Sequence, residues 1–479
     1  IYYSRFAHRK PKKMKELLRN KFFKFGIAGV LYLLWVIWVG NFWLLLGLPI
    51  VFDIYVSKKV NWAFWKKRHG KNHVVIEWLD ALIFAVIAVT LINIFLFQNY
   101  RIPTPSMEKT LLVGDHLAVS KVAYGPRMPN TPLAFPFTQH TMPFTGGKGK
   151  SWSDLIHWKY KRLKGFGHVK NNDIVVFNFP AGDTVCLEQQ AISYYEIVRE
   201  RIETLTAEDI RAGRPLKSKD EYYSVARQMI WNEYTVIYRP VDRRDNYVKR
   251  CVGIPGDTVL IKGGKLFING HENAEFETQQ TSYYVRTNGT RINPKAFERM
   301  GVSKSDQSLM LSGTVYRLPL TKENAKTISG FANVTGIEAD YHRPGEYLAS
   351  VFPHDPAYRW NEDYFGPLWI PKKGTTVKLD MTNINFYTSI IDIYEENDLE
   401  IRDTVIYING KPADSYTFKM DYYWMMGDNR HDSADSRFWG FVPEDHIVGR
   451  PVRVWLSIDK EAQGFKKIRF NRFFKAAKR

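Results

Sequence analysis

The stretch Asp245-Asn-Tyr-Val-Lys-Arg-Cys-Val-Gly-Ile-Pro-Gly-Asp-Thr-Val-Leu-Ile-Lys262 contains two runs, 246–254 and 257–262, rich in residues typical of β-strands. Similar runs recur along the chain, together with Asn-Gly pairs, which are strong signals for tight hairpin turns. The runs lie at 172–179 and 404–408, and the Asn-Gly pairs at 269–270 and 409–410. These patterns predict a mainly β fold for the chain beyond residue 97.

Two apolar segments precede this β region, at residues 26–56 and 74–97. The second has 24 residues, which as an α-helix span roughly 36 Å and can cross a bilayer core of about 30 Å. A basic lead (1–25) and a basic linker (57–73) flank the first segment. We therefore expect N-terminal transmembrane helices that anchor the β domain.

The net charge of +19 is concentrated beside these apolar segments and near the C-terminus. Residues 1–75 contribute +13 and residues 460–479 contribute +7, so the long middle of the chain is close to neutral. A protein that binds nucleic acid more often carries its charge on a folded face. We therefore expect a lipid bilayer, and no nucleic acid, as a partner.

The distribution of positive charge also predicts the orientation in the membrane. Positively charged loops stay on the cytoplasmic side, which places the linker 57–73 there and everything from residue 98 onward outside the cytoplasm. The lead 1–25 is equally basic and favours the cytoplasm too. The segment 26–56 is then either a single span, which would send the lead out, or a re-entrant hairpin that turns at Gly40-Asn41.

The β region contains a long segment between the Asn-Gly pairs at 269–270 and 409–410. We expect a β domain formed by residues 98–270 and 400–479, interrupted by a β-rich insertion at 271–399 with a helix near 382–396. Residues 151–168 have apolar residues at helical spacing and are expected to form an amphipathic helix that packs on the domain or rests on the membrane. The basic C-terminal tail either docks on the domain or touches anionic lipid.

The two cysteines, Cys186 and Cys251, are too few for a disulfide framework and have no spacing typical of a metal site. One bridge between them is possible. We expect no metal and no cofactor.

The chemistry begins with Ser106, in the segment Ile-Pro-Thr-Pro-Ser106-Met directly after the second apolar run. Pro103 and Pro105 hold this segment extended, but a serine hydroxyl needs a base to become a nucleophile. Lys249, on the strand 246–254, is the candidate base. Its pKa must fall from about 10.4 toward 7–8 for this role, which corresponds to roughly 4 kcal/mol of disfavoured charge.

A third segment indicates that Ser106 and Lys249 belong to one site. It reads Gly427-Asp-Asn-Arg-His-Asp-Ser433-Ala-Asp435-Ser-Arg437 and resembles the most specific signature of the bacterial type I signal peptidases. The segments around Ser106, Asp173 and Lys249 resemble the remaining motifs of that family, in the same order. The resemblance covers about 98–260 and 400–457 with the anchor, and the length of the chain resembles the long form found in Bacteroidetes. It implies a signal-peptidase-type all-β catalytic domain.

The resemblance also implies a role for each matching residue. Ser106 would be the nucleophile and Lys249 the general base, with Ser433 orienting the lysine amine. Thr104 would complete an oxyanion hole with the Ser106 N–H. Asp435 and Arg437 would form a supporting salt bridge, and Asp428 would help to shape the site. The family cleaves after small residues, and our candidates for the apolar lining are Tyr100, Ile102, Met107, Leu111, Tyr247 and Val248.

The expected function is therefore that of a membrane-bound serine endopeptidase. It would remove signal peptides from secretory preproteins after an Ala-x-Ala pattern, through an acyl-enzyme. The expected location is the bacterial inner membrane, with the catalytic domain on its extracytoplasmic face.

One departure from the family pattern is Lys109, which stands where the family usually has proline. It creates a rival motif, because Ser106-Met-Glu-Lys109 is the S-x-x-K signature of penicillin-binding proteins. The chain has no Lys-Thr-Gly element, which those enzymes need. Two further interpretations are a non-catalytic binding protein of the same fold and a self-cleaving relative of the SOS-repressor proteases. The membrane segments disfavour the second of these.

Overall fold

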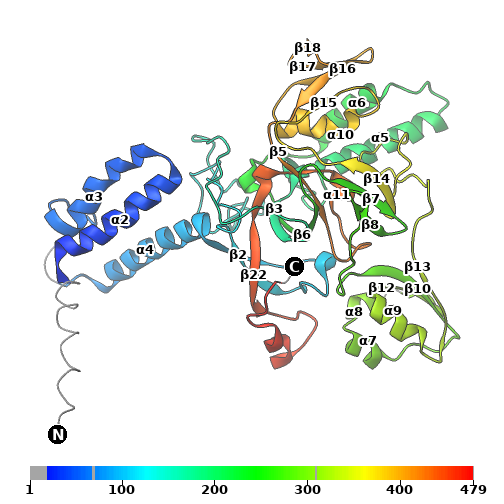
Figure 1. The fold of residues 1–479 in the computed structure, drawn as a ribbon, viewed down its shortest axis with the longest axis horizontal. Helices are drawn as coiled ribbons and strands as arrows, with labels where there is room; N and C mark the ends of the chain where they lie inside the picture. The colour runs from blue at the N-terminus through cyan, green and yellow to red at the C-terminus, as the bar shows by residue number, and fades with distance from the viewer. Residues whose placement is uncertain (1–18, 67–70, 308–309, 478–479) are drawn as a thin grey trace, which may run out of the picture. The chain divides into compact units, whose positions relative to one another are not determined.

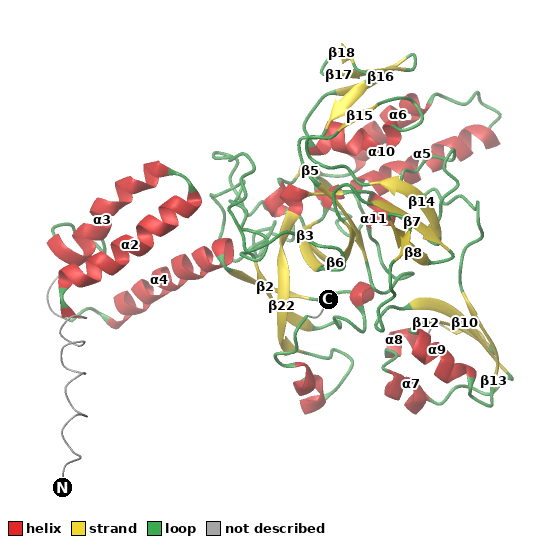
Figure 2. Cartoon of the chain, viewed as in Figure 1, coloured by secondary structure: helices red, strands yellow, loops and turns green. Residues whose placement is uncertain are grey.

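The chain divides into two compact units, residues 1–91 and 92–479. The computed structural model describes residues 19–66, 71–307 and 310–477 (Figure 1). The predicted basic lead lies outside the described residues up to residue 18, and so do residues 67–70 of the predicted linker. The described part of the first unit is helical, whereas the second unit is mainly β (Figure 2).

The first unit contains a helical hairpin. Helix α2 (Lys21–Val39) ends at Gly40, whose φ of +67° is a left-handed conformation that glycine adopts readily. The chain then returns along α2 through a 3₁₀ turn (Phe42–Gly47), α3 (Leu48–Phe52) and a π-helical turn (Asp53–Ser57). The segment 26–56 therefore reverses at Gly40-Asn41 and is not one continuous helix.

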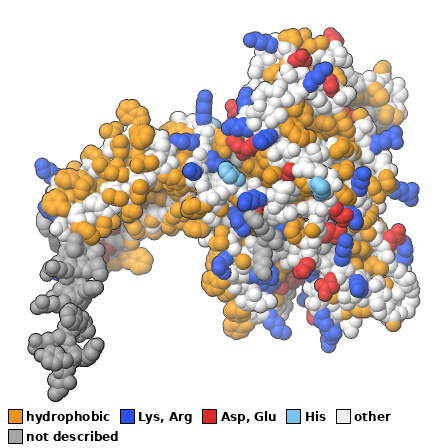
Figure 3. Space-filling model, viewed as in Figure 1, with side chains coloured by type: hydrophobic (Ala, Val, Ile, Leu, Met, Phe, Trp, Pro, Cys, Tyr) orange, Lys and Arg blue, Asp and Glu red, His pale blue; other side chains and the backbone are white. Residues whose placement is uncertain are grey.

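Helices α2 and α4 (Val74–Phe95) are both long and apolar enough to cross a membrane. Apolar side chains cover the described surface of these helices (Figure 3). For example, Trp78 is 75% exposed and Phe84 is 73% exposed. Exposed apolar surface of this extent marks contact with a membrane or a partner protein. It supports the predicted membrane anchor.

The second unit is built on a seven-stranded sheet in which every neighbouring pair is antiparallel. Its strands, in spatial order, are β1 (Phe97–Arg101), β2 (Asp115–Ser120), β22 (Ile447–Ser457), β3 (Ile174–Asn178), β6 (Asn246–Gly253), β20 (Tyr422–Met426) and β21 (Val442–Pro443). The strands predicted at 172–179 and 246–254 are confirmed as β3 and β6, which pair in the centre of the sheet.

Two smaller sheets contain the predicted hairpins. One has the order β14 (Tyr364–Trp369), β7 (Thr258–Lys262), β8 (Lys265–Ile268) and β9 (His271–Glu272), and the other β16 (Leu399–Arg402), β17 (Val405–Ile408) and β18 (Lys411–Pro412). Both Asn-Gly pairs form the turns, with positive φ at all four residues. The largest core cluster, around Trp424, Phe365 and Phe418, connects the seven-stranded sheet with the β14–β9 sheet.

Part of the predicted insertion forms a subdomain with its own core. Its sheet has the order β11 (Met310–Ser312), β12 (Val315–Leu320), β10 (Thr281–Thr287) and β13 (Val334–Ala339). The helices α7 (Pro294–Met300), α8 (Lys304–Gln307) and α9 (Lys322–Ser329) belong to the same region. Farther along the chain, β15 (Thr376–Lys378) pairs with β19 (Ser415–Thr417), and α10 (Ile384–Ser389) with a π-helical turn (Ile390–Tyr394) confirms the helix expected near 382–396.

The amphipathic helix predicted at 151–168 is wrong, because this segment is irregular and extended. Its backbone is bound to distant loops, with bridges from Trp152 to Ala134 and from Arg162 to Arg127. Trp152 and Leu163 are buried in the domain, while Leu155 is 88% exposed. Tertiary contacts of these two buried side chains, rather than a continuous helical face, determine the local structure.

A helical hairpin that was not predicted from the sequence follows β3. It consists of α5 (Tyr194–Arg211) and α6 (Lys219–Glu233), and the short strands β4 (Thr184–Cys186) and β5 (Val236–Tyr238) pair at its base. Cys186 packs against this hairpin, whereas Cys251 lies in a different core cluster. Both cysteines are buried free thiols, so the possible bridge between them does not form.

The C-terminal tail docks on the second unit. The Lys475 carbonyl accepts a hydrogen bond from the Val454 N–H at 2.9 Å, and Arg472 forms a buried ion pair with Asp115. This contact places the tail beside the loop that carries Ser106.

Candidate active site

Ser106 lies in a tight turn that follows β1. Pro105, Ser106 and Met107 form a 3₁₀ turn, and the Leu111 N–H donates to the Met107 carbonyl at 2.8 Å. Met107 and Leu111 are buried in the core beneath the turn, which fixes its position. The Ser106 carbonyl accepts a hydrogen bond from the Asn429 N–H at 3.1 Å. Within the described ranges, the Ser106 hydroxyl has no hydrogen-bond partner.

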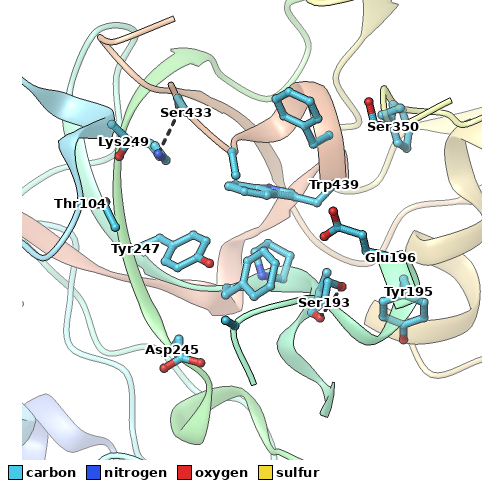
Figure 4. A pocket seen from close by; sticks show the side chains of 18 of the residues that line it. Thr104, Ser193, Tyr195, Glu196, Asp245, Tyr247, Lys249, Ser350, Ser433 and Trp439 are labelled. Carbon is cyan, nitrogen blue, oxygen red and sulfur yellow. Dashed lines mark hydrogen bonds between the residues drawn. The ribbon is translucent and has the colours of Figure 1, made fainter. Parts of the chain in front are cut away.

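Lys249 lies on β6, in the centre of the sheet, and is only 4% exposed. Its amine donates a hydrogen bond of 3.0 Å to the Ser433 hydroxyl (Figure 4). Ser433 in turn donates to the Asp435 carboxylate at 2.9 Å. A chain of buried hydrogen bonds therefore fixes the position of the lysine amine.

Burial determines the protonation of this amine. Removal from water lowers the pKa of Lys249 to about 8, although the nearby Asp435 carboxylate opposes the shift. A lysine with this pKa is still mostly protonated at pH 7, but its neutral fraction is far larger than that of an exposed lysine. The neutral form that a general base requires is therefore accessible near neutral pH.

The Asp435 carboxylate is bound in a buried pair with Arg437. Arg437 Nε donates to Oδ1 at 2.9 Å and Nη2 donates to Oδ2 at 2.8 Å, while the Gly427 N–H donates to Oδ2 at 3.0 Å. Burial opposes ionisation of the carboxyl, but Arg437 holds the pKa of Asp435 below its ordinary value. The ionised carboxylate thus remains available to accept the hydrogen bond from Ser433.

A second buried pair joins Asp428 and Arg250. Arg250 donates to both carboxylate oxygens, at 2.8 and 2.6 Å, and the Thr110 hydroxyl donates to Asp428 Oδ2 at 2.6 Å. This pair therefore connects the β6 strand, the 427–437 segment and the loop after Ser106. Each buried carboxylate oxygen of Asp428 has a specific donor, as expected for polar groups in a protein interior.

Gly427 allows the two sides of the site to approach each other. A Cβ atom at this position would lie 2.2 Å from Ser433 Oγ and 2.6 Å from the Ser106 carbonyl oxygen. Any other residue here would push the nucleophile turn and the Ser433 segment apart.

Ser106, Lys249, Ser433 and Thr104 line one cavity of about 1470 Å³. Thr104 is exposed in extended backbone directly before the nucleophile turn. Five of the six apolar residues predicted to line the site do line this cavity: Tyr100, Ile102, Met107, Tyr247 and Val248. Leu111 is not among the described residues of the cavity wall; it is 1% exposed and belongs to the core cluster beneath the turn.

The cavity extends well beyond the predicted residues. Figure 4 shows Lys249, Ser433 and Thr104 at one end, and Ser193, Tyr195, Glu196 and Ser350 toward the other. The far wall comes from α5, α6, α10 and loops between residues 349 and 362, with Trp439, on α11 (Ser436–Trp439), between the two ends. This wall was not predicted from the sequence. The capping box formed by Ser218 and Glu221 was the signal that could have revealed the helical hairpin.

The Lys109 side chain contacts the end of α7. Its amine donates to the carbonyl of Met300 at 2.7 Å and to the carbonyl of Gly301, at the C-terminal end of α7. Its φ is +68°, which proline cannot adopt because its ring fixes φ near −65°. The Lys109 amine is therefore engaged by α7, and the described wall of the cavity does not include Lys109.

Comparisons with known proteins are consistent with this arrangement. The family described as "Signal peptidase, peptidase S26" matches residues 75–310 and 413–456, together more than half of the chain. The signal peptidase I of Haemophilus influenzae is 26% identical over 404 residues, which cover 84% of this chain and 76% of the relative. That of Buchnera aphidicola subsp. Baizongia pistaciae is 21% identical over 412 residues, 85% of each chain. The matched family regions contain Ser106, Lys249 and Ser433.

Proposed function

The chain belongs to the signal peptidase family, peptidase S26, and from this premise we propose a Ser106–Lys249 mechanism for it. It is a serine peptidase of the signal peptidase I type.

In the acylation step, neutral Lys249 accepts the proton of the Ser106 hydroxyl as Oγ attacks the scissile carbonyl carbon. The resulting ammonium then gives this proton to the leaving amine, so that the peptide bond breaks and an ester with Ser106 forms. In deacylation, Lys249 accepts a proton from water as the water oxygen attacks the ester carbonyl carbon. The ammonium then returns this proton to Ser106 Oγ as the ester C–O bond breaks, which releases the new C-terminal acid and restores neutral Lys249 and the serine hydroxyl. The lowered pKa of Lys249 and its hydrogen bond to Ser433 support this role.

The developing oxyanion would be bound by the Thr104 hydroxyl and the Ser106 N–H. Ser106 occupies the first turn of a 3₁₀ segment, where backbone N–H groups have no partner inside the turn. Thr104 lines the same cavity. A donor of this kind contributes about 2.7–4 kcal/mol to stabilisation of the transition state.

The proposed substrates are secretory preproteins with small residues at P1 and P3. Tyr100, Ile102, Met107, Tyr247 and Val248 would form the apolar binding surface beside the nucleophile. The apolar helices α2 and α4 would anchor the enzyme in the inner membrane, with the second unit on the extracytoplasmic face. The segment 311–412, which lies between the two matched regions, is the basis for proposing a long form of the Bacteroidetes kind.

The hydrogen-bonded chain from Lys249 through Ser433 to Asp435 carries this proposal, because it places a buried amine in the same cavity as Ser106. The test uses the full chain in detergent and a preprotein with an Ala-x-Ala site, with products identified by mass spectrometry. Ser106→Ala should abolish cleavage, while Ser329→Ala, which removes an exposed serine on α9, should leave it unchanged. Cleavage that persists in Ser106→Ala would contradict the proposal.

A further inference from the structure

The turn that carries Ser106 contains a residue in an unfavourable backbone conformation. Lys109 has a φ of +68°, in the left-handed region that residues with a Cβ atom rarely occupy. Such conformations persist only where surrounding contacts determine them. The contacts that determine this one come from a distant part of the sequence.

The contact partner is the C-terminal end of α7, whose last carbonyl groups lack helical partners. The Lys109 amine donates to two of them, those of Met300 and Gly301. A cation is favourable at this end of a helix. Burial lowers the pKa of Lys109, which agrees with an amine that is partly removed from water at this contact.

The acceptor is itself firmly held. Phe297 of α7 is 2% exposed and packs in the core of the subdomain with Tyr316 and Leu318. The Asn324 side chain, on α9, donates to the same Met300 carbonyl at 3.1 Å. The position of α7 is therefore set by its own subdomain and not by the Lys109 contact.

The same subdomain also contacts the other side of the active site. The Gln280 N–H donates to the Asp428 carbonyl at 2.8 Å, and the Arg430 N–H donates to the Gln280 carbonyl at 2.9 Å. Gln280 thus pairs with the backbone around Asn429, which holds the Ser106 carbonyl. In addition, Thr278 Oγ1 lies 2.7 Å from Thr110 Oγ1.

We propose that residues 276–339, the clasp subdomain, hold the nucleophile turn in register with the base, and that Lys109 is the positioning residue through which they do so. The inference rests on the proposed function, because it assigns a role in the Ser106–Lys249 reaction. Lys109 takes no part in the chemistry. The family pattern has a rigid proline at this position. In this chain, the hydrogen bonds from Lys109 to α7 take the place of that rigidity.

The first test measures kcat and KM for preprotein cleavage by full-length variants in detergent. Lys109→Ala should lower kcat by about 10- to 100-fold with KM changed by less than about twofold, since misplacement of a reacting group by about 1 Å costs rate on this scale. Lys109→Arg, which retains a cation and donors, should restore kcat to within about threefold of the wild type.

Lys109→Gly separates the amine from the backbone strain. Glycine adopts a positive φ without steric cost, so this variant removes the tether without adding backbone strain, and its kcat should fall as in Lys109→Ala. Full activity of Lys109→Gly would overturn the proposal. The matched control is Lys322→Ala, which removes an exposed lysine that pairs with Glu275 in the same region, and its kcat should not change.

A second measurement does not depend on cleavage. Hydrogen–deuterium exchange of peptides covering 105–115 should become faster in Lys109→Ala and stay unchanged in Lys322→Ala. Unchanged exchange in Lys109→Ala would show that Lys109 does not hold the turn. Faster exchange together with a wild-type kcat would show that holding the turn does not position Ser106 for catalysis. If the wild-type protein cleaves no preprotein, the proposed function fails, but the exchange experiment still decides whether Lys109 holds the turn.

Discussion

The base side and the nucleophile side of the cavity are held in place by different means. On the base side, side chains form the support: Lys249 donates to Ser433, Ser433 to Asp435, and Asp435 pairs with Arg437. On the nucleophile side, the Ser106 hydroxyl has no hydrogen-bond partner in the described part of the chain, and its backbone carbonyl is bound by Asn429.

This difference shows which half of the reaction is prepared before substrate arrives. The base is oriented and its pKa is lowered by burial in the free enzyme. The nucleophile turn is held through its backbone, with the Ser106 carbonyl bound by Asn429, so the Ser106 hydroxyl remains free to rotate toward the base when substrate binds. Catalytic hydrogen bonds often form in this way, tightening only in the substrate complex.

The largest expected effect comes from breaking the buried pair on the base side. Asp435→Asn removes the charge partner of Arg437, which is 1% exposed. We expect a loss of up to about 3–5 kcal/mol in the free energy of unfolding, because the buried Arg437 cation loses its closest charge partner and keeps only Glu362, at 3.9 Å. Urea denaturation of the full chain in detergent measures it.

The matched control for this variant is Glu338→Gln, which breaks an exposed pair with Arg286. Its cost should be about 0–1 kcal/mol. Equal losses in the two variants would mean that the Asp435–Arg437 pair is not a structural support of the base side.

The next largest effect is expected from Ser433→Ala, which removes the group that orients the Lys249 amine. The kcat for preprotein cleavage should fall by about 10²-fold, at the lower end of the contribution of general base catalysis. Stability should fall by only about 1 kcal/mol. Ser329→Ala, which also removes one serine hydrogen bond, should leave kcat unchanged. A wild-type kcat in Ser433→Ala would show that Ser433 does not orient the Lys249 amine for catalysis.

The smallest effect concerns pH. Only neutral Lys249 can accept a proton, so kcat/KM should rise with pH through a midpoint near 8. The Asp432 carboxylate favours the ammonium form of Lys249 and so offsets part of the lowering of its pKa by burial. Asp432→Asn should therefore move the midpoint to lower pH and increase the relative rate at pH 7. Asp403→Asn, in the β16–β17 turn, should not move it. An unmoved midpoint in Asp432→Asn would show that the titrating group is not Lys249.

Much of the catalytic sheet could be predicted because its signals are local. The strand around Lys249 is indicated by β-prone residues such as Tyr247, Val248 and Val252, and each Asn-Gly pair specifies its own hairpin turn. The motif resemblance predicts that the three segments with Ser106, Lys249 and Ser433 share one site, and they line one cavity.

The remaining features depend on contacts that sequence spacing does not contain. Trp152 and Leu163 have helical spacing but are buried by separate tertiary contacts, so the helix at 151–168 does not form. Leu111 is predicted in the substrate site but packs into the core. The partners of Lys109 are 191 and 192 residues away, and nothing near Lys109 in the sequence indicates them.

The most direct test of the central claim replaces each of the two candidate lysines by arginine. Arginine keeps the charge and the donors of lysine but cannot lose its proton near neutral pH. The cleavage rate of a preprotein should fall by about 10²–10⁴-fold in Lys249→Arg, because a base is lost. It should stay within about threefold of the wild type in Lys109→Arg. An active Lys249→Arg enzyme together with an inactive Lys109→Arg enzyme would contradict the assignment of Lys249 as the base.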